Sequence, residues 1–156
     1  MSASATCVLM NGAVPIFADI DSNTFCIDSA SVENRITKRT KAVMMVNLFG
    51  QTGDMSALIK VARKHHLAII EDNAQSSGAT WRSRYTGTVG DIGVFSFNVH
   101  KTMQAGEGGV RLSAESAWSG PMVLLFKAPA EPFRRVVVAG LEVELPPPKT
   151  EADKTH

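Results

Sequence analysis

Two short apolar runs, each ending in polar residues, constrain the fold of this chain more than any other feature. The first run covers residues 68–70 and ends in the polar stretch 71–75. The second covers residues 92–95 and ends in the polar stretch 96–101. Runs that are apolar throughout are typical of strands buried on both faces of a parallel sheet. Ligands of such sheets bind at the C-terminal ends of the strands, so we expect the two polar stretches to form a site.

The rest of the pattern predicts an α/β fold. Asp28 and Asp54 are suitable N-caps for helices that end near residues 36 and 65. Apolar strands that alternate with helices predict a three-layer α/β/α arrangement around a mostly parallel sheet. Strands are expected over residues 14–18, 42–46, 68–71, 92–96 and 108–112.

The character of the chain changes after residue 113, which divides it into a main part, 1–113, and a divergent tail, 114–156. In the tail, a turn is expected at 118–121, followed by the apolar stretch 122–126. Residues 136–145 are expected to form a hairpin or a strand. Three prolines and a charged end follow, a composition typical of disorder, so we expect the tail to be partly disordered.

Charge and cysteine content narrow the classes of function. The chain has 16 basic and 15 acidic residues, interspersed along its length. That balance argues against a nucleic-acid partner and against an anionic membrane surface. The two cysteines form no CxxC motif, which fits a reduced, cytoplasmic setting. We expect no signal peptide, because the first residues lack a basic segment, and no apolar run is long enough to cross a bilayer.

Lys101 and Asp72 are the main candidates for chemistry. An isolated lysine is usually a surface charge, but an amine held among apolar walls loses its proton more readily and becomes nucleophilic. Asp72 follows Glu71, and neighbouring side chains of a strand point to opposite faces, so only one acid can reach a given site. The commoner fate of such an aspartate is to cap a turn. An acid for a pyridinium nitrogen and a lysine for an aldehyde are together what pyridoxal phosphate requires.

Three neighbouring polar residues are weaker candidates. Gln75 lies one helical turn beyond Asp72, although alone it would be a surface amide. Ser96 and Asn98 share one side of the chain if the strand continues that far, and a hydroxyl there can donate to a phosphate oxygen. His65 and His66 face different ways on a helix and are interpreted as its C-terminal residues, so no metal site is predicted.

Other site classes lack their motifs. The chain has no GxxxxGK[ST] phosphate loop and no GxGxxG after a strand, which disfavours a nucleotide-binding or dinucleotide-binding fold. It also has no GxSxG elbow, which disfavours a serine hydrolase.

Several stretches, taken with their order and spacing, resemble the DegT/DnrJ/EryC1/StrS family of pyridoxal-phosphate-dependent sugar aminotransferases, which have the aspartate aminotransferase fold. The resemblance runs from about residue 2 to residue 112, and implies that the chain is part of the large domain of that fold. The stretches that carry it are 14–21, 39–43, 46–51, 70–75, 87–91, 96–101 and 106–109.

The resemblance implies a role for each candidate. Lys101 would bind the cofactor aldehyde covalently, and Asp72 would pair with the pyridine nitrogen. Gln75 would contact the cofactor ring near its phenolic oxygen, and Ser96 would bind the phosphate. Asn98 would serve the cofactor site of the neighbouring subunit. Relatives that carry histidine in place of this lysine dehydrate sugars, so the lysine favours transamination.

The activity implied by the resemblance is transamination of a keto group on a nucleotide-linked sugar, with glutamate as the amino donor, in polysaccharide or amino-sugar biosynthesis. Family relatives are homodimers. The family pattern also includes an N-terminal phosphate-binding turn and a ring-stacking aromatic that this chain lacks, and none of the pattern follows residue 112. We therefore expect a truncated chain with weak or no activity alone. The alternatives are a catalytically inactive remnant, a regulatory binding module, or a generic nucleotide-binding α/β domain.

Overall fold

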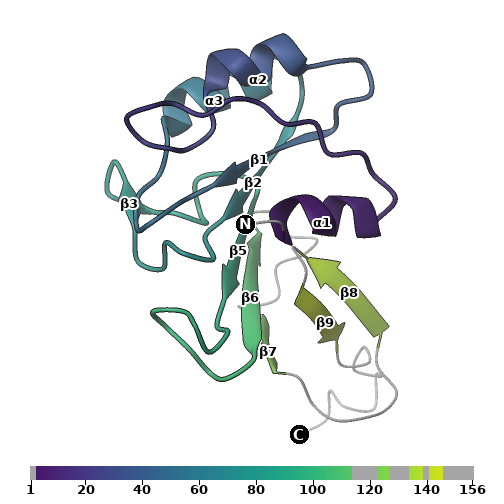
Figure 1. Cartoon of the computed structure of the whole chain (residues 1–156), viewed down its shortest axis with the longest axis vertical. Coiled ribbons are helices and arrows are strands. Elements are labelled where there is room, and N and C mark those ends of the chain that lie inside the picture. The colour runs from purple at the N-terminus through teal and green to yellow at the C-terminus, as the bar shows by residue number, and fades with distance from the viewer. Residues whose placement is uncertain (1–2, 114–122, 127–133, 139–140, 146–156) are drawn as a thin grey trace, which may run out of the picture.

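A five-stranded sheet in the order β1-β2-β5-β6-β7 forms the centre of the computed structural model, which describes residues 3–113, 123–126, 134–138 and 141–145 (Figure 1). Strands β1, β2 and β5 run parallel, whereas β6 and β7 are antiparallel to their neighbours. The α/β class and the mostly parallel sheet expected from the sequence are therefore confirmed. The strands are β1 (Ala42–Val46), β2 (Ala68–Asp72), β5 (Ile92–Ser96), β6 (Gly108–Ser113) and β7 (Val123–Phe126).

In the described part of the chain, three helices accompany the sheet: α1 (Ala3–Met10), α2 (Ser29–Arg35) and α3 (Met55–Lys64). The expected N-caps are confirmed, because the Asp28 carboxylate accepts hydrogen bonds from the backbone at the start of α2 and the Asp54 carboxylate does so for α3. Such caps satisfy N–H groups that have no partner within the helix. Within the described residues, no helix reaches the length and hydropathy that a membrane span requires.

The hydrophobic core lies where α2 and α3 pack against β1 and β2. Leu58 and Ala62 of α3 are buried together with Met45 of β1 and Ile69 of β2, and Val32 adds the contribution of α2. In α3 the apolar positions recur at the spacing of one helical face, so the helix presents a single apolar stripe to the sheet. The parallel pairing of β1 with β2 aligns their C-terminal ends, and this core packs α2 and α3 against the pair.

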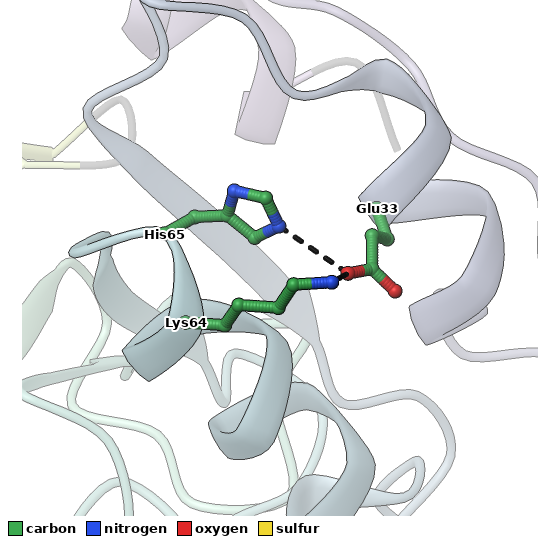
Figure 2. A network of polar contacts seen from close by, with 3 residues as sticks. All are labelled: Glu33, Lys64 and His65. Carbon is green, nitrogen blue, oxygen red and sulfur yellow. Dashed lines mark hydrogen bonds and ion pairs between the residues drawn. The ribbon is translucent and has the colours of Figure 1, made fainter.

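A polar cluster ties the two helices together outside this core. The Glu33 carboxylate of α2 accepts a 2.5 Å hydrogen bond from Lys64 Nζ at the end of α3, and His65 Nε2 lies 3.3 Å from the same oxygen (Figure 2). The hydrogen bond from Lys64, followed by that from His65, lowers the pKa of Glu33 below its usual value.

The strand expected at residues 14–18 is wrong. The segment between α1 and α2 contains only an isolated bridge between Ile20 and Ile27, and its large apolar side chains are exposed: Val14 77%, Ile16 65% and Phe17 72%. A strand needs a neighbour that takes up its backbone hydrogen bonds, and no described segment pairs with residues 14–18. The apolar composition of residues 14–18 therefore reflects a propensity for strand, but the segment has no neighbouring strand to pair with in the described structure.

Two small hairpins complete the structure. Strands β3 (Thr80–Trp81) and β4 (Arg84–Tyr85) form one that the sequence pattern did not reveal. Strands β8 (Arg134–Val138) and β9 (Leu141–Leu145) form the other, so the first of the two alternatives expected over 136–145, a hairpin or a strand, is the one observed. The turn expected at 118–121 and the disorder expected from residue 146 lie outside the described residues.

Candidate functional site

The polar residues that follow β2 and β5 lie at one edge of the sheet. Asp72 is the last residue of β2 and is aligned with Val46 of β1 and Val94 of β5. Ser96 ends β5 two residues further along. Because these strands are parallel, Asp72 and Ser96 are delivered to the same C-terminal edge, where α/β sheets bind ligands.

Asp72 is almost completely buried, with 6% of its surface exposed, and its carboxylate accepts two hydrogen bonds. Its Oδ1 accepts a hydrogen bond of 3.1 Å from the backbone N–H of Ala74. Its Oδ2 accepts a hydrogen bond of 2.7 Å from the hydroxyl of Ser4 in α1. An ionised carboxylate has about four acceptor sites, so the side chain can still accept from a ligand.

Glu71, the neighbouring acid, points to the opposite face and is completely buried. Its Oε2 accepts a hydrogen bond from Gly87 N (2.8 Å), and its Oε1 accepts from Val89 N (2.8 Å) and Gly90 N (2.6 Å). Glu71 therefore anchors the turn at residues 87–90, and Asp72 is the acid at the C-terminal edge of the sheet.

Lys101 sits in a loop that is closed at its base. The backbone N–H of Phe97 donates to Gly108 O at 2.8 Å, and the Asn98 amide donates to Glu107 Oε1 at 3.1 Å. Within the loop, Lys101 N donates to Asn98 O at 2.9 Å. The Lys101 side chain is half-buried. Its ammonium makes no hydrogen bond or ion pair with the part of the chain that the structure describes.

The other candidate side chains differ in how many of their polar atoms are already hydrogen-bonded within the protein. Ser96 Oγ accepts from Asn98 N at 3.4 Å, which leaves the hydroxyl proton to be donated elsewhere. Both ends of the Asn98 amide are engaged, because Oδ1 accepts from His100 N at 3.1 Å while Nδ2 bonds Glu107. Gln75 is exposed in the turn after β2. The roles assigned to these side chains in cofactor binding stay predictions.

A buried amide pair supports this edge and was not singled out in the sequence. Asn47, directly after β1, donates from Nδ2 to Asn73 Oδ1 at 2.7 Å, and both side chains are fully buried. The Ser76 hydroxyl donates to Asn47 O at 2.8 Å and so links the loops after β1 and β2. An asparagine immediately after an apolar run is the only local signal that points to this pair.

The groups at this edge fit pyridoxal phosphate. Asp72 is a buried carboxylate that is held in place and still has acceptor capacity, as a pyridinium N–H requires. Ser96 has a hydroxyl proton to donate, and Lys101 has an amine that no described residue engages. These groups therefore include one candidate partner for each of the ring nitrogen, the phosphate and the aldehyde.

Comparison with known proteins gives one consistent result. The model of the DegT/DnrJ/EryC1/StrS aminotransferase family matches residues 1–128. Among curated relatives, an L-glutamine:2-deoxy-scyllo-inosose aminotransferase of Streptoalloteichus tenebrarius is 47% identical over 117 residues, which are 74% of this chain and 28% of that protein. A GDP-perosamine synthase of Caulobacter vibrioides is 43% identical over 133 residues, which are 85% of this chain and 36% of that protein.

Solved structures agree with these relatives. An aminotransferase from Psychrobacter cryohalolentis superposes with a TM-score of 0.72 at 39% identity, over 74% of this chain and 29% of that one. A Streptococcus pneumoniae protein named as a sugar aminotransferase, solved in its PLP form, gives 0.70 at 28% identity, over 72% and 33%. The chain spans about a quarter to a third of the length of the curated relatives it matches.

Proposed function

Because this chain belongs to the DegT/DnrJ/EryC1/StrS aminotransferase family, we propose that its site transfers an amino group with pyridoxal phosphate as cofactor. The observation that carries the proposal is the Lys101 amine. Lys101 is a half-buried residue in a closed loop directly after β5, its amine has no partner in the described structure, and Asp72 and Ser96 lie at the adjoining strand ends.

Each side chain has a distinct task in this proposal. When bound, the cofactor supplies an electron sink for the negative charge that forms on the carbon of the amino donor. Asp72 holds the proton on the ring nitrogen, and Ser96 donates its hydroxyl proton to the phosphate. The Lys101 amine would bind the aldehyde of the cofactor, and as general base and then acid it would hold and return the proton taken from the carbon of the amino donor. Gln75 orients the ring from the turn after β2.

The amino acceptor that we propose is a keto group on a nucleotide-linked sugar. A relative named GDP-perosamine synthase and a structure of DesI with its TDP-sugar product support this class of acceptor. Glutamate is the donor that the family resemblance implies, whereas several relatives are named for L-glutamine. Both donors therefore belong in the assay. We also propose that the protein acts as a homodimer, in which Asn98 of one subunit serves the site of the other.

Covalent trapping tests the site directly. The protein is incubated with pyridoxal phosphate, reduced with borohydride and digested, and its peptides are analysed by mass spectrometry. We expect the cofactor mass on Lys101, its loss in Lys101→Ala, and its retention in Lys60→Ala, which removes an exposed lysine from α3. Label spread over surface lysines without preference for Lys101 would contradict the proposed site.

A second experiment separates an enzyme from a non-catalytic binding module. Trapped protein at Lys101 combined with amino transfer from L-glutamate or L-glutamine to a nucleotide-linked keto-sugar supports the aminotransferase. Trapping at Lys101 with no transfer from either donor supports the binding module.

A further inference from the structure

We propose that Ser4 is a positioning residue, which holds the Asp72 carboxylate in the orientation that the ring nitrogen of the cofactor requires. The inference rests on the proposed function, because Asp72 is the acid assigned to that nitrogen. It adds a residue of α1 to a site otherwise built from the ends of strands.

The contact is short and is made to a buried acceptor. The Ser4 hydroxyl lies 2.7 Å from Asp72 Oδ2, across a sequence separation of 68 residues. The backbone N–H of Ala74 donates to the other oxygen, Oδ1, so each oxygen of the Asp72 carboxylate has one donor. A carboxylate held by two donors on two oxygens cannot rotate without breaking one of them. The oxygen lone pairs that remain therefore face a fixed direction.

Burial and hydrogen bonds within α1 hold the part of the helix that carries Ser4. Cys7 of the same helix is buried, and its thiol donates to Ser4 O at 3.2 Å. The helix ends at Met10, where the Asn11 side chain donates to Cys7 O at 2.8 Å. Ser4 lies in the first turn of α1, yet its hydroxyl donates to Asp72 across the fold. The Ser4 hydroxyl is therefore a hydrogen-bond donor to the acid at the end of β2.

A first experiment needs no cofactor. Amide hydrogen exchange at Ala74 reports whether the Asp72 carboxylate still holds that N–H. In Ser4→Ala we expect exchange at Ala74 to accelerate roughly tenfold, the change that corresponds to loss of a hydrogen bond to a charged group. Ser4→Thr keeps a hydroxyl and should restore slow exchange. Ser29→Ala, which removes a half-buried hydroxyl from the first turn of α2, should leave Ala74 unchanged.

The amides of Asn11 and Gly12, which bond carbonyls of α1, distinguish positioning from simple support of the helix. If they accelerate as much as Ala74 in Ser4→Ala, the hydroxyl merely holds α1 in place and the inference is overturned. If Ala74 keeps its slow exchange, Ser4 does not position Asp72, and the inference is overturned as well.

The second experiment uses the cofactor. We expect the dissociation constant for pyridoxal phosphate to rise roughly tenfold in Ser4→Ala and to recover in Ser4→Thr. The ¹⁵N chemical shift of a labelled ring nitrogen should move in Ser4→Ala toward that of the unprotonated ring. Unchanged or tighter binding with an unchanged shift would mean that the hydroxyl is irrelevant or competes with the cofactor. If no cofactor is trapped at Lys101, the proposed function fails, whereas the exchange experiment still decides the role of Ser4.

Discussion

At the scale of single residues, the two adjacent acids of β2 have opposite surroundings. The Glu71 carboxylate accepts only from backbone N–H groups and is completely buried, whereas the Asp72 carboxylate accepts from one backbone N–H and one hydroxyl at the edge where α/β sheets bind ligands. Alternation along a strand predicts that they diverge. It does not predict which of them anchors a turn, because that depends on where residues 87–90 fold back.

Replacing Glu71 by glutamine should therefore destabilise the protein strongly. The amide keeps one acceptor oxygen but turns an NH₂ group toward a backbone N–H, which leaves buried donors without an acceptor. We expect a loss of about 2 kcal/mol in the free energy of unfolding, measured by urea denaturation. Asp19→Asn, the same change at an exposed aspartate, should alter it by less than about 0.5 kcal/mol. Equal effects of the two variants would show that the turn does not depend on the carboxylate.

Glu33 gives a pH-dependent prediction. Its pKa is lowered in the folded protein by Lys64 first and His65 second. A carboxyl group whose pKa is lower in the folded than in the unfolded protein stabilises the fold at pH values above its unfolded-state pKa. This stabilisation is lost as the pH falls through the folded-state pKa. At neutral pH, Glu33→Gln should lower the urea midpoint slightly, since the pair is exposed. The difference should shrink toward zero as the pH falls through the lowered pKa of Glu33. A difference that persists in acid would contradict this account.

At the scale of elements, patterns that are local in the chain were enough for most of the fold. The caps Asp28 and Asp54 mark the starts of α2 and α3, and the apolar runs mark β1, β2 and β5. The β3–β4 hairpin was missed because Arg82 and Ser83 adopt the left-handed conformation (φ 48° and 66°). Turns of that kind are usually signalled by glycine or asparagine. Ser4 was missed because no local pattern reports a contact over 68 residues.

The packing of the 87–90 turn onto β5 predicts an unusually costly substitution at Gly93. A Cβ there would lie 2.2 Å from the backbone oxygen of Gly87, so Gly93→Ala forces two backbone segments apart. We expect a loss of at least about 3 kcal/mol in unfolding free energy. Gly78 has φ +84° with open space around it, so Gly78→Ala should cost only about 1–2 kcal/mol from backbone strain. Urea denaturation of both variants compares the cost of steric overlap with the cost of backbone strain. A smaller loss of unfolding free energy in Gly93→Ala than in Gly78→Ala would contradict the close approach of Gly93 to Gly87.

At the scale of the whole molecule, the segment between α1 and α2 leaves large apolar side chains in contact with water. Val14, Ile16, Phe17, Ile20 and Phe25 are all more than half exposed. In Figure 1 this is the dark coil that joins the two helices. Such a density of exposed apolar residues in one segment is typical of a surface that is covered by another chain or that aggregates.

We therefore expect this chain to self-associate in solution. Exchanging Ile16 and Phe17 for serine should shift the distribution toward monomer in analytical ultracentrifugation. The same double variant should keep its unfolding free energy within about 0.5 kcal/mol, because both side chains are already exposed. Tyr85→Ser, which changes an exposed aromatic outside the segment, serves as the control. Association that persists in the double variant would place the contact elsewhere.

The closed loop around Lys101 has a consequence for the order in which the site assembles. Its closing contacts join residues about ten positions apart, Asn98 with Glu107 and Phe97 with Gly108, so they cost little chain entropy. The contact between Ser4 and Asp72 spans most of the described chain and waits for the sheet to form. We therefore expect the loop around Lys101 to close early in folding and the contact between Ser4 and Asp72 to form late. The final orientation of the Asp72 carboxylate then waits for α1 to pack against the sheet.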